Sequence, residues 1–308
     1  MTTITRRAAA GTLLALLLTA CNAGSTGDNA AINPGATPSG PAATAPAPAA
    51  TTTTPTPTMT LAVYYLVETR NGPMLQREFR AVPRNVAKVR AAVDAMLHLK
   101  PRDRDYTSVW PKATTIRGIS MKDDVATVDL SAEAGTASAG SAVEGVSFQQ
   151  LIYTVTAAAP AVEKVRLLID GKERETLWGH VDIRGAHARG NHTTYWAPVS
   201  VEKPLEGTTV RRTLTFGGTS NTFEANVVWE IRTGCAPGTT CVEKPKTYKK
   251  SHTTATAGTG TRGSWSVTVK LPAEVFETSG WIEIRAMEYS AKDGSEIYND
   301  TKVVRAVA

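Results

Sequence analysis

The chain has few of the features that mark common functional classes. Three cysteines among 308 residues exclude a dense disulfide scaffold. No Gly-x-Ser-x-Gly elbow, Gly-Lys-Thr phosphate loop or His-Glu-x-x-His helix occurs, and each of those spacings marks a particular catalytic chemistry. The five histidines show no metal-ligand spacing. The sequence therefore predicts a protein that is not an enzyme and that holds neither a cofactor nor a metal.

The first 20 residues have the pattern of a secretory signal. Arg6 and Arg7 precede a mostly apolar run, which is shorter than the roughly 20 residues that a membrane crossing needs. The run ends in Leu-Thr-Ala before Cys21, which resembles the lipobox of bacterial lipoproteins. That resemblance implies cleavage before Cys21, a diacylglycerol on its thiol, and attachment to the outer, extracytoplasmic face of the cell membrane. The alternative is an ordinary signal peptide followed by a coincidental cysteine.

Residues 21–59 predict a disordered tether. They are mostly Ala, Thr, Pro, Gly and Ser, which offer too little apolar surface to offset the entropy of ordering. The prolines favour extended geometry at about 3.1 Å per residue, so the tether could reach up to roughly 100 Å from the membrane. The Thr/Pro density also suits O-glycosylation.

Two cysteines remain once Cys21 is assigned to the lipid. Cys235 and Cys241 flank the turn-forming Pro237-Gly238 pair, and an oxidising compartment permits a disulfide between them. A two-cysteine metal site is the rival interpretation, but no histidine or second cysteine pair lies at ligand spacing. We expect the disulfide.

A first folded domain is predicted over residues 60–196. Apolar, β-prone runs separated by turn residues predict hairpins over 61–82 and 115–130 and a strand over 165–169. Apolar residues at helical spacing predict helices over 85–99 and 143–159. Segregated hairpins and helices indicate an α+β fold, with the helices on one face of a mostly antiparallel sheet.

A second domain is predicted over residues 198–308. Its apolar residues alternate in short segments with Gly, Thr, Pro and Asp between them, and no helical period stands out. This spacing is typical of a β-sandwich.

Three segments of the first domain resemble the GerMN domain of sporulation and germination lipoproteins. They are Val125-Ala-Thr-Val-Asp-Leu-Ser131, Phe148-Gln-Gln-Leu-Ile-Tyr-Thr-Val-Thr156 and Val162-Glu-Lys-Val-Arg-Leu-Leu-Ile-Asp-Gly-Lys172. The resemblance covers residues 60–196 and implies a fold similar to the small α/β modules of ring assemblies, so an oligomer through this domain is an expectation. No catalytic residues carry over from the family.

The second domain resembles Gmad2, an immunoglobulin-like germination domain that often follows GerMN. The resemblance rests on Phe223-Glu-Ala-Asn-Val227, Gly260-Thr-Arg-Gly-Ser-Trp265 and Tyr289-Ser-Ala-Lys-Asp-Gly-Ser295. Trp265 stands where the family often has Phe. The implied architecture is an immunoglobulin-like sandwich.

The remaining chemistry-bearing residues have plain structural interpretations. His180, His187 and His192 are predicted to be solvated loop residues, and the tryptophans are assigned to core packing. Four lysines near Tyr248 predict either a solvated loop or a patch for an anionic polymer such as teichoic acid, phospholipid or acidic glycan. These lysines are Lys244, Lys246, Lys249 and Lys250, and the tryptophans are Trp110, Trp178, Trp196, Trp229, Trp265 and Trp281.

Together these patterns predict a non-enzymatic, lipid-anchored envelope protein that binds or assembles other envelope components. The net charge of +6 falls to about +4 when Arg6 and Arg7 leave with the signal, which favours anionic surfaces and does not indicate nucleic acid. Expected partners are the membrane, through the lipid, and envelope proteins or wall polymer. A solute- or glycan-binding lipoprotein that partners a membrane protein is the alternative, and a wall hydrolase with an unfamiliar site is a third.

Overall fold

The computed structural model describes residues 57–234, 236, 245–277 and 280–308. The first domain begins with a long hairpin of β1 (Thr58–Thr69) and β2 (Gly72–Pro83), which pair antiparallel along their whole length. Gly72 has a positive φ of 106°, a conformation that a side chain disfavours, so this residue suits the tight turn. The short strand β3 (Tyr106–Thr107) pairs with the far end of β1 and completes a three-stranded sheet.

A second sheet of the first domain has four strands in the order β4-β5-β6-β7. β4 (Ile116–Lys122) and β5 (Val125–Leu130) form the second predicted hairpin. β6 (Lys164–Ile169) runs parallel to β5, because a helical crossover joins them, and β7 (Ala186–Ala188) pairs antiparallel with β6.

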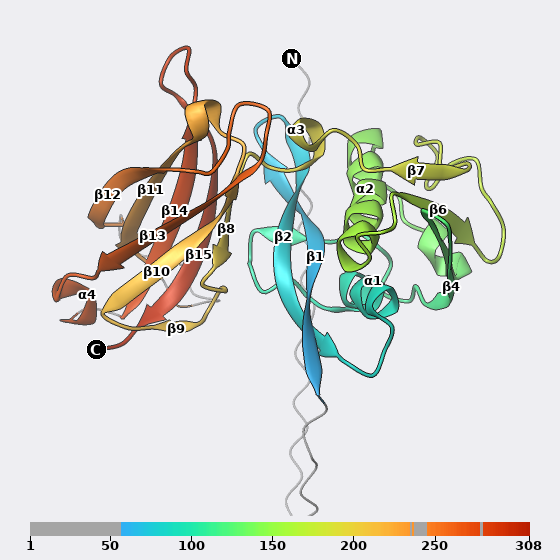
Figure 1. Ribbon diagram of the computed structural model, residues 1–308, viewed down its shortest axis with the longest axis horizontal. Coiled ribbons are helices and arrows are strands. Elements are labelled where there is room, and N and C mark those ends of the chain that lie inside the picture. The colour runs from blue at the N-terminus through green and yellow to red at the C-terminus, as the bar shows by residue number, and fades with distance from the viewer. Residues whose placement is uncertain (1–56, 235, 237–244, 278–279) are drawn as a thin grey trace, which may run out of the picture. The chain divides into compact units, whose positions relative to one another are not determined.

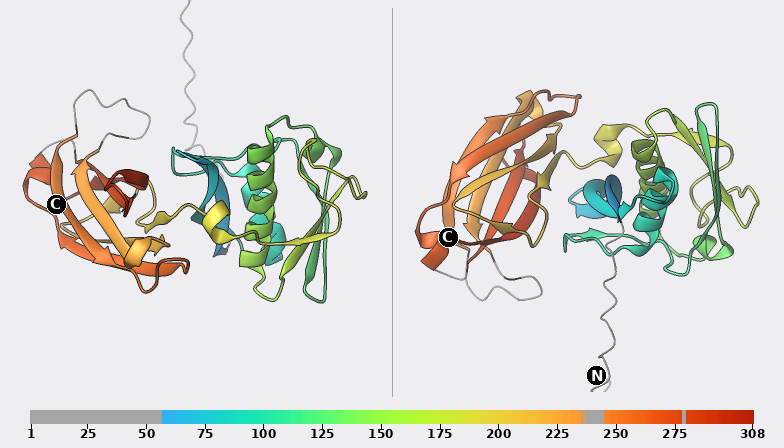
Figure 2. Two further views of the ribbon diagram at one scale, coloured as in Figure 1. Left: turned by 90° about the horizontal axis from the view of Figure 1, so that it is seen from above. Right: turned by 60° about the horizontal axis from the view of Figure 1, so that its bottom comes forward.

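Two helices, α1 (Lys88–His98) and α2 (Ser141–Ala158), lie between these sheets (Figures 1 and 2). Both helices contact β1, while α1 also contacts β4 and α2 contacts β6. This position explains why α2 is buried nearly all round, because a helix that packs on both sides has no wide solvent-exposed face. The apolar residues whose spacing predicts this helix are buried: Val146, Phe148, Leu151, Ile152 and Val155.

The predicted α+β class is confirmed, but the strands do not form one sheet with helices on one face. They divide into two sheets with the helices between them. Local alternation of apolar residues identifies strands without identifying their pairing partners, so the sequence did not reveal the division.

Buried polar side chains tie these elements together. Gln150 donates to the Tyr64 carbonyl at 2.8 Å, and the Thr154 hydroxyl accepts from the Tyr64 N–H at 3.2 Å. At the other sheet, Asp129 accepts from the Gly171 N–H at 2.9 Å, which holds the turn after β6 against β5. Each contact falls within a segment that carries the GerMN resemblance, so those motifs join separate elements.

The second domain is a two-sheet β-structure. One sheet has the order β13-β10-β8 and the other β12-β11-β14-β15-β9. Phe216, Trp229 and Trp265 form its aromatic centre, with ring centroids 5.4 and 6.1 Å apart. The all-β prediction is confirmed. Its strands are β8 (Val199–Lys203), β9 (Thr209–Val210), β10 (Thr213–Ser220), β11 (Asn226–Thr233), β12 (Thr247–Thr254), β13 (Gly263–Lys270), β14 (Trp281–Tyr289) and β15 (Glu296–Ala306).

Short helical turns complete the chain. They are the 3-10 turns η1 (Ala132–Gly135) and η2 (Phe223–Ala225) and the four-residue helices α3 (His192–Tyr195) and α4 (Glu274–Glu277). No helix among the described residues is long and apolar enough to cross a bilayer.

A buried charged cluster connects the loop before β3 with β15. Lys302 is 3% exposed, forms an ion pair with Asp103, and lies 3.4 Å from a carboxylate oxygen of Asp300. Tyr106 donates to Asp300 at 2.9 Å and accepts from Lys302 at 2.9 Å. The second oxygen of Asp300 accepts from the Val201 N–H at 2.6 Å. Each charged group of the cluster therefore has an opposite charge and hydrogen bonds to offset its burial.

A candidate arginine–aromatic groove

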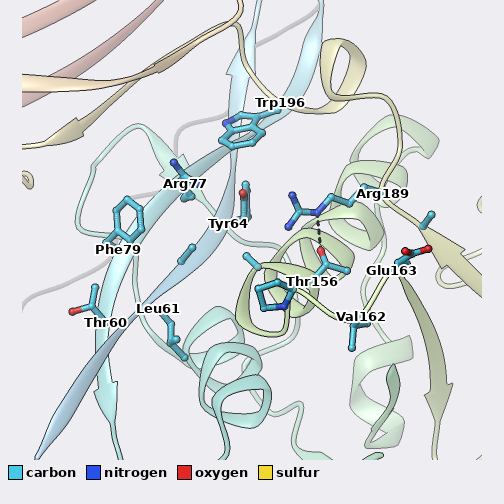
Figure 3. Close-up of a pocket in the computed structure, with 14 residues that line it drawn as sticks. Thr60, Leu61, Tyr64, Arg77, Phe79, Thr156, Val162, Glu163, Arg189 and Trp196 are labelled. Carbon is cyan, nitrogen blue, oxygen red and sulfur yellow. Dashed lines mark hydrogen bonds between the residues drawn. The ribbon is translucent and has the colours of Figure 1, made fainter. Parts of the chain in front are cut away.

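A groove of about 780 Å³ lies beside β1 in the first domain, and we call it the β1 groove. Its lining comes from β1 and β2 on one side and from the end of α2 and the loops after it on the other (Figure 3). Its polar and aromatic lining includes Thr60, Tyr64, Arg77, Phe79, Glu163, Arg189 and Trp196.

Strand alternation explains why these side chains share one face. Side chains two residues apart on a strand point the same way, so Ala62 and Tyr64 face together. Their partners across the hairpin are Phe79 and Arg77, which extend the same face onto β2. The opposite face carries Val63 and Tyr65 into the main core.

Arg77 lines one wall of the groove, and its charge is already paired with a carboxylate of the same chain. Its guanidinium binds both carboxylate oxygens of Glu202, at 2.6 and 2.8 Å. The same group lies over the rings of Phe79 and Trp196, with centroid distances of 4.9 and 5.1 Å. A fork-to-fork pair of this kind fixes the guanidinium plane and neutralises its charge.

Arg189 is held differently. Its Nε donates to the Thr156 hydroxyl at 2.7 Å, and a terminal nitrogen donates to the Tyr153 carbonyl at 3.2 Å. The guanidinium lies 4.7 Å from the centroid of the Tyr153 ring. These acceptors are neutral, and no carboxylate of the described chain forms an ion pair with Arg189. Figure 3 shows the guanidinium pointing into the groove, so the groove contains a positioned positive charge.

Trp196 closes one end of the groove. Its ring is 9% exposed and meets Tyr64 and Tyr153 edge-on, at 5.3 and 6.1 Å. The Arg262 guanidinium lies 4.0 Å from its centroid, in addition to that of Arg77. The indole N–H has no hydrogen-bond partner among the described residues.

The ionisable groups around this end keep the site positive. Burial raises the pKa of Tyr64, and burial also raises the pKa of Tyr153 to about 12. Both phenols therefore stay neutral at ordinary pH. Burial lowers the pKa of Arg262 to about 10, which still leaves that group charged at pH 7. Such an arrangement suits the binding of an anionic group.

Most of the site residues predicted from the sequence lie elsewhere. Cys21, Cys235, Cys241 and Lys244 lie outside the described residues, so lipidation and the disulfide stay predictions.

The lysines that are described belong to a strand and its approach, not to the expected loop. Lys246 pairs with Glu274 at 2.7 Å, and Lys250 lies 3.3 Å from the Tyr289 hydroxyl. Lys249 and Lys250 are consecutive in β12 and so point to opposite faces. The anionic-polymer patch stays a prediction.

The three histidines do not converge. His180 bonds the buried Glu144 at 2.8 Å, His187 lies in β7, and His192 begins α3. The last two therefore belong to short elements and not to a solvated loop. No group of three or more potential metal ligands occurs among the described residues.

The groove itself was missed in the sequence. Thr156 and Arg189 are 33 residues apart, and Arg77 meets Glu202 across 125 residues. Trp196 was assigned to core packing, which is correct for most of its surface. The only local signal was the loss of apolar character after α2, where Pro160 ends the helix and Arg189 follows in a polar loop.

Comparisons with known proteins agree with this architecture. Residues 62–175 match the family described as sporulation and spore germination, and residues 198–295 match the immunoglobulin-like domain of bacterial spore germination. No curated protein matches the sequence significantly.

Solved structures that match part of the chain include the following three. A candidate lipoprotein from Clostridium perfringens is 20% identical, with 43% of this chain and 88% of that chain covered and a TM-score of 0.32. The tandem GerMN domains of the Bacillus subtilis sporulation protein GerM are 18% identical, with 46% and 50% covered and a TM-score of 0.37. The first GerMN domain of that protein alone is 20% identical, with 44% and 98% covered and a TM-score of 0.35. The chain belongs to the proteins in which a sporulation and spore germination (GerMN) domain precedes a Gmad2 immunoglobulin-like domain.

Proposed function

We propose that this chain is a lipid-anchored binding module of the cell envelope, which acts without catalysis and holds a partner in the β1 groove. The signal pattern and Cys21 support anchoring at the extracytoplasmic face, and the tether carries the folded part away from the membrane. The domain pair supports a role related to sporulation and germination proteins, although a shared fold does not fix function.

One observation carries the binding role: Arg189 is pre-positioned in an open groove by neutral acceptors. A side chain that is already held loses little entropy when a ligand arrives, which raises affinity. Arg77 differs, because Glu202 already satisfies its charge.

The glycan-binding alternative is less favoured by the groove. Sugar recognition by stacking needs an open aromatic face, whereas the guanidinium groups of Arg77 and Arg262 already lie over Trp196. Anionic polymer at the β12 lysines remains a separate proposal. It is tested by binding of the soluble chain to wall preparations at low and high salt.

Anchoring is tested by the mass and location of the protein. The mature protein should carry acyl chains on Cys21 and fractionate with the membrane, and protease added to intact spheroplasts should digest it. The Cys21→Ser variant should lose the acyl mass and appear in the soluble fraction. An unacylated wild-type protein in the cytosol would contradict the proposal.

Partner binding is tested with a photo-crosslinking amino acid at Thr60, on the rim of the groove. We expect a reproducible adduct in cells that the added Arg189→Gln substitution weakens. The same probe at Thr215, an exposed position of β10, is the matched control. Equal adducts from both positions would mean that the groove is not the binding surface.

A further inference from the structure

The backbone of β1 has an open edge inside the β1 groove. The N–H and C=O of Tyr64 point away from β2, as their hydrogen-bond partners show. These partners are the side chains of Thr154 and Gln150 on α2. Backbone groups two residues apart on a strand point the same way, so those of Ala62 and Thr60 also face away from β2.

This edge is uncovered because α2 ends. Gln150 and Thr154 of α2 both bond the backbone of Tyr64, and the helix stops at Ala158. β3 pairs only with Leu66 and Val67, at the far end of the strand. In the described part of the chain, the outward backbone groups of Thr60 and Ala62 therefore have no partner.

The wall facing this edge is mostly apolar, and the guanidinium of Arg189 lies at its end. Ala157 at the end of α2 and Pro160 and Val162 beyond it line the groove, with Glu163 following Val162, and Arg189 stands near Tyr64 (Figure 3). Alternating donors and acceptors on one side, apolar surface on the other and a fixed guanidinium at the end together match an extended peptide with a carboxylate. Recognition of this kind takes its affinity from main-chain hydrogen bonds and its specificity from side-chain pockets.

We propose that an extended segment of a partner protein adds a strand to the edge of β1 at Thr60 and Ala62 and places a carboxylate on Arg189. The partner is thus an acidic or C-terminal polypeptide segment in β-conformation. This inference rests on the proposed function and names the class of ligand that the groove takes. Unpaired strand edges are templates for such addition unless charge or proline blocks them, and neither occurs at Thr60 or Ala62.

The first test measures peptide binding to the mature chain carrying Cys21→Ser. The probe is the hexapeptide Thr-Val-Thr-Val-Thr-Val with a free carboxylate, compared with its C-terminal amide and with a form N-methylated at every residue, since methylation at alternate residues would leave one peptide edge free to pair. We expect the free acid to bind about tenfold more tightly than the amide, as one lost charge-assisted hydrogen bond predicts. N-methylation should abolish binding. Equal binding by the methylated peptide, or no binding by any peptide at millimolar concentration, would overturn the inference.

Variants separate the edge from the charge. Ala62→Pro removes the outward N–H without touching the hydrogen bonds to β2, since proline is tolerated at strand edges. It should remove binding of both acid and amide, whereas Arg189→Gln should remove only the preference for the acid. Circular dichroism and the urea midpoint establish that each variant is folded. If Ala62→Pro proves unfolded, N-methylation of every residue of the peptide makes the same test on the wild type.

Hydrogen exchange tests whether the edge is free. The amides of Thr60 and Ala62 should exchange quickly alone and slow at least tenfold with the peptide. Protection without peptide would mean that the chain's own preceding segment occupies the edge, and this would overturn the proposal. Crosslinking at Thr60 to a non-protein polymer would leave the proposed binding role intact and exclude the peptide.

Discussion

Single polar side chains in the first domain act by completing hydrogen bonds that the strands leave open. Thr154 is fully buried, yet it carries a hydroxyl, because the Tyr64 N–H beside it has no strand partner. A buried polar group without a hydrogen-bond partner destabilises the fold by more free energy than a typical hydrogen bond contributes. The loss of such a side chain should therefore lower stability markedly.

Thr154→Val tests this role. Valine has nearly the same shape but cannot accept the Tyr64 N–H, so we expect unfolding to become easier by about 1–3 kcal/mol. Thr213→Val, at an exposed position of β10, is the matched control and should change stability little. Urea denaturation measures both, and equal effects would contradict the explanation.

Lys302 makes a larger contribution because its partners are charged. Replacing it by methionine leaves Asp103 and Asp300 buried without a cation, so Lys302→Met should destabilise the protein by about 3–5 kcal/mol. Lys270→Met, at an exposed position of β13, serves as the control and should have little effect. A Lys302→Met variant as stable as the wild type would mean that Lys302 does not neutralise Asp103 and Asp300 in a buried cluster.

Helices and strands contact one another through side chains that are far apart in sequence. The sequence can therefore predict single elements but not which elements pair. The two hairpins and the two helices follow from apolar spacing and turn residues, and all four occur near their predicted positions. The division into two sheets does not follow, because it depends on which strand pairs with β5 after the α2 crossover. Strand β12 was missed for a different reason: an edge strand rich in lysine has no apolar alternation.

The same limit applies to the groove. Cys21 and the signal pattern are local in sequence, so the sequence alone suggests them and they stay predictions. Arg189 becomes a candidate only because Thr156 and Tyr153 hold it in the groove. The open edge of β1 depends on where α2 ends relative to β1, and no single-sequence pattern records that relation.

Glu144 fastens a loop to the start of α2. Its side chain is fully buried and accepts N–H bonds from Trp178 and Val181 at 2.9 Å and from His180 at 3.0 Å. Burial would raise the pKa of Glu144, but these bonds together lower it. The carboxylate therefore stays ionised at neutral pH, where it can accept from all three amides.

Glu144→Gln replaces one acceptor oxygen by an amide donor. We expect a loss of about 1.5–3 kcal/mol, the range for bonds to a charged group, with faster hydrogen exchange at Trp178 and Val181. Glu175→Gln, at an exposed loop position, is the control. Unchanged exchange at the loop amides would show that the carboxylate does not hold it.

For the molecule as a whole, buried acids predict greater stability in mild acid. Burial raises the pKa of Glu206 to about 7 and that of Asp300 to about 6. Both groups hold their protons more tightly in the folded state than in the unfolded chain. Their stabilising effect is complete below their ordinary pKa values near 4 and is lost as the pH rises through about 6–7.

Urea denaturation from pH 5 to pH 8 should therefore show a falling midpoint. Glu206→Gln should flatten part of that slope, because glutamine cannot release a proton. Below pH 4 the trend should reverse, since protonation of Glu144 then removes its bonds. A midpoint that rises between pH 5 and pH 8 would show that these acids titrate normally in the fold.

The hairpin that borders the groove also follows the predicted tether directly in sequence. β1 begins at Thr58 and is paired with β2 through twelve residues, from Thr58 to Thr69. Any pull on a membrane-bound front end would thus be transmitted first to this ladder, as mechanical load. A peptide added along the same strand would share that load. Tension on the anchor and binding in the groove would then act on the same residues of β1.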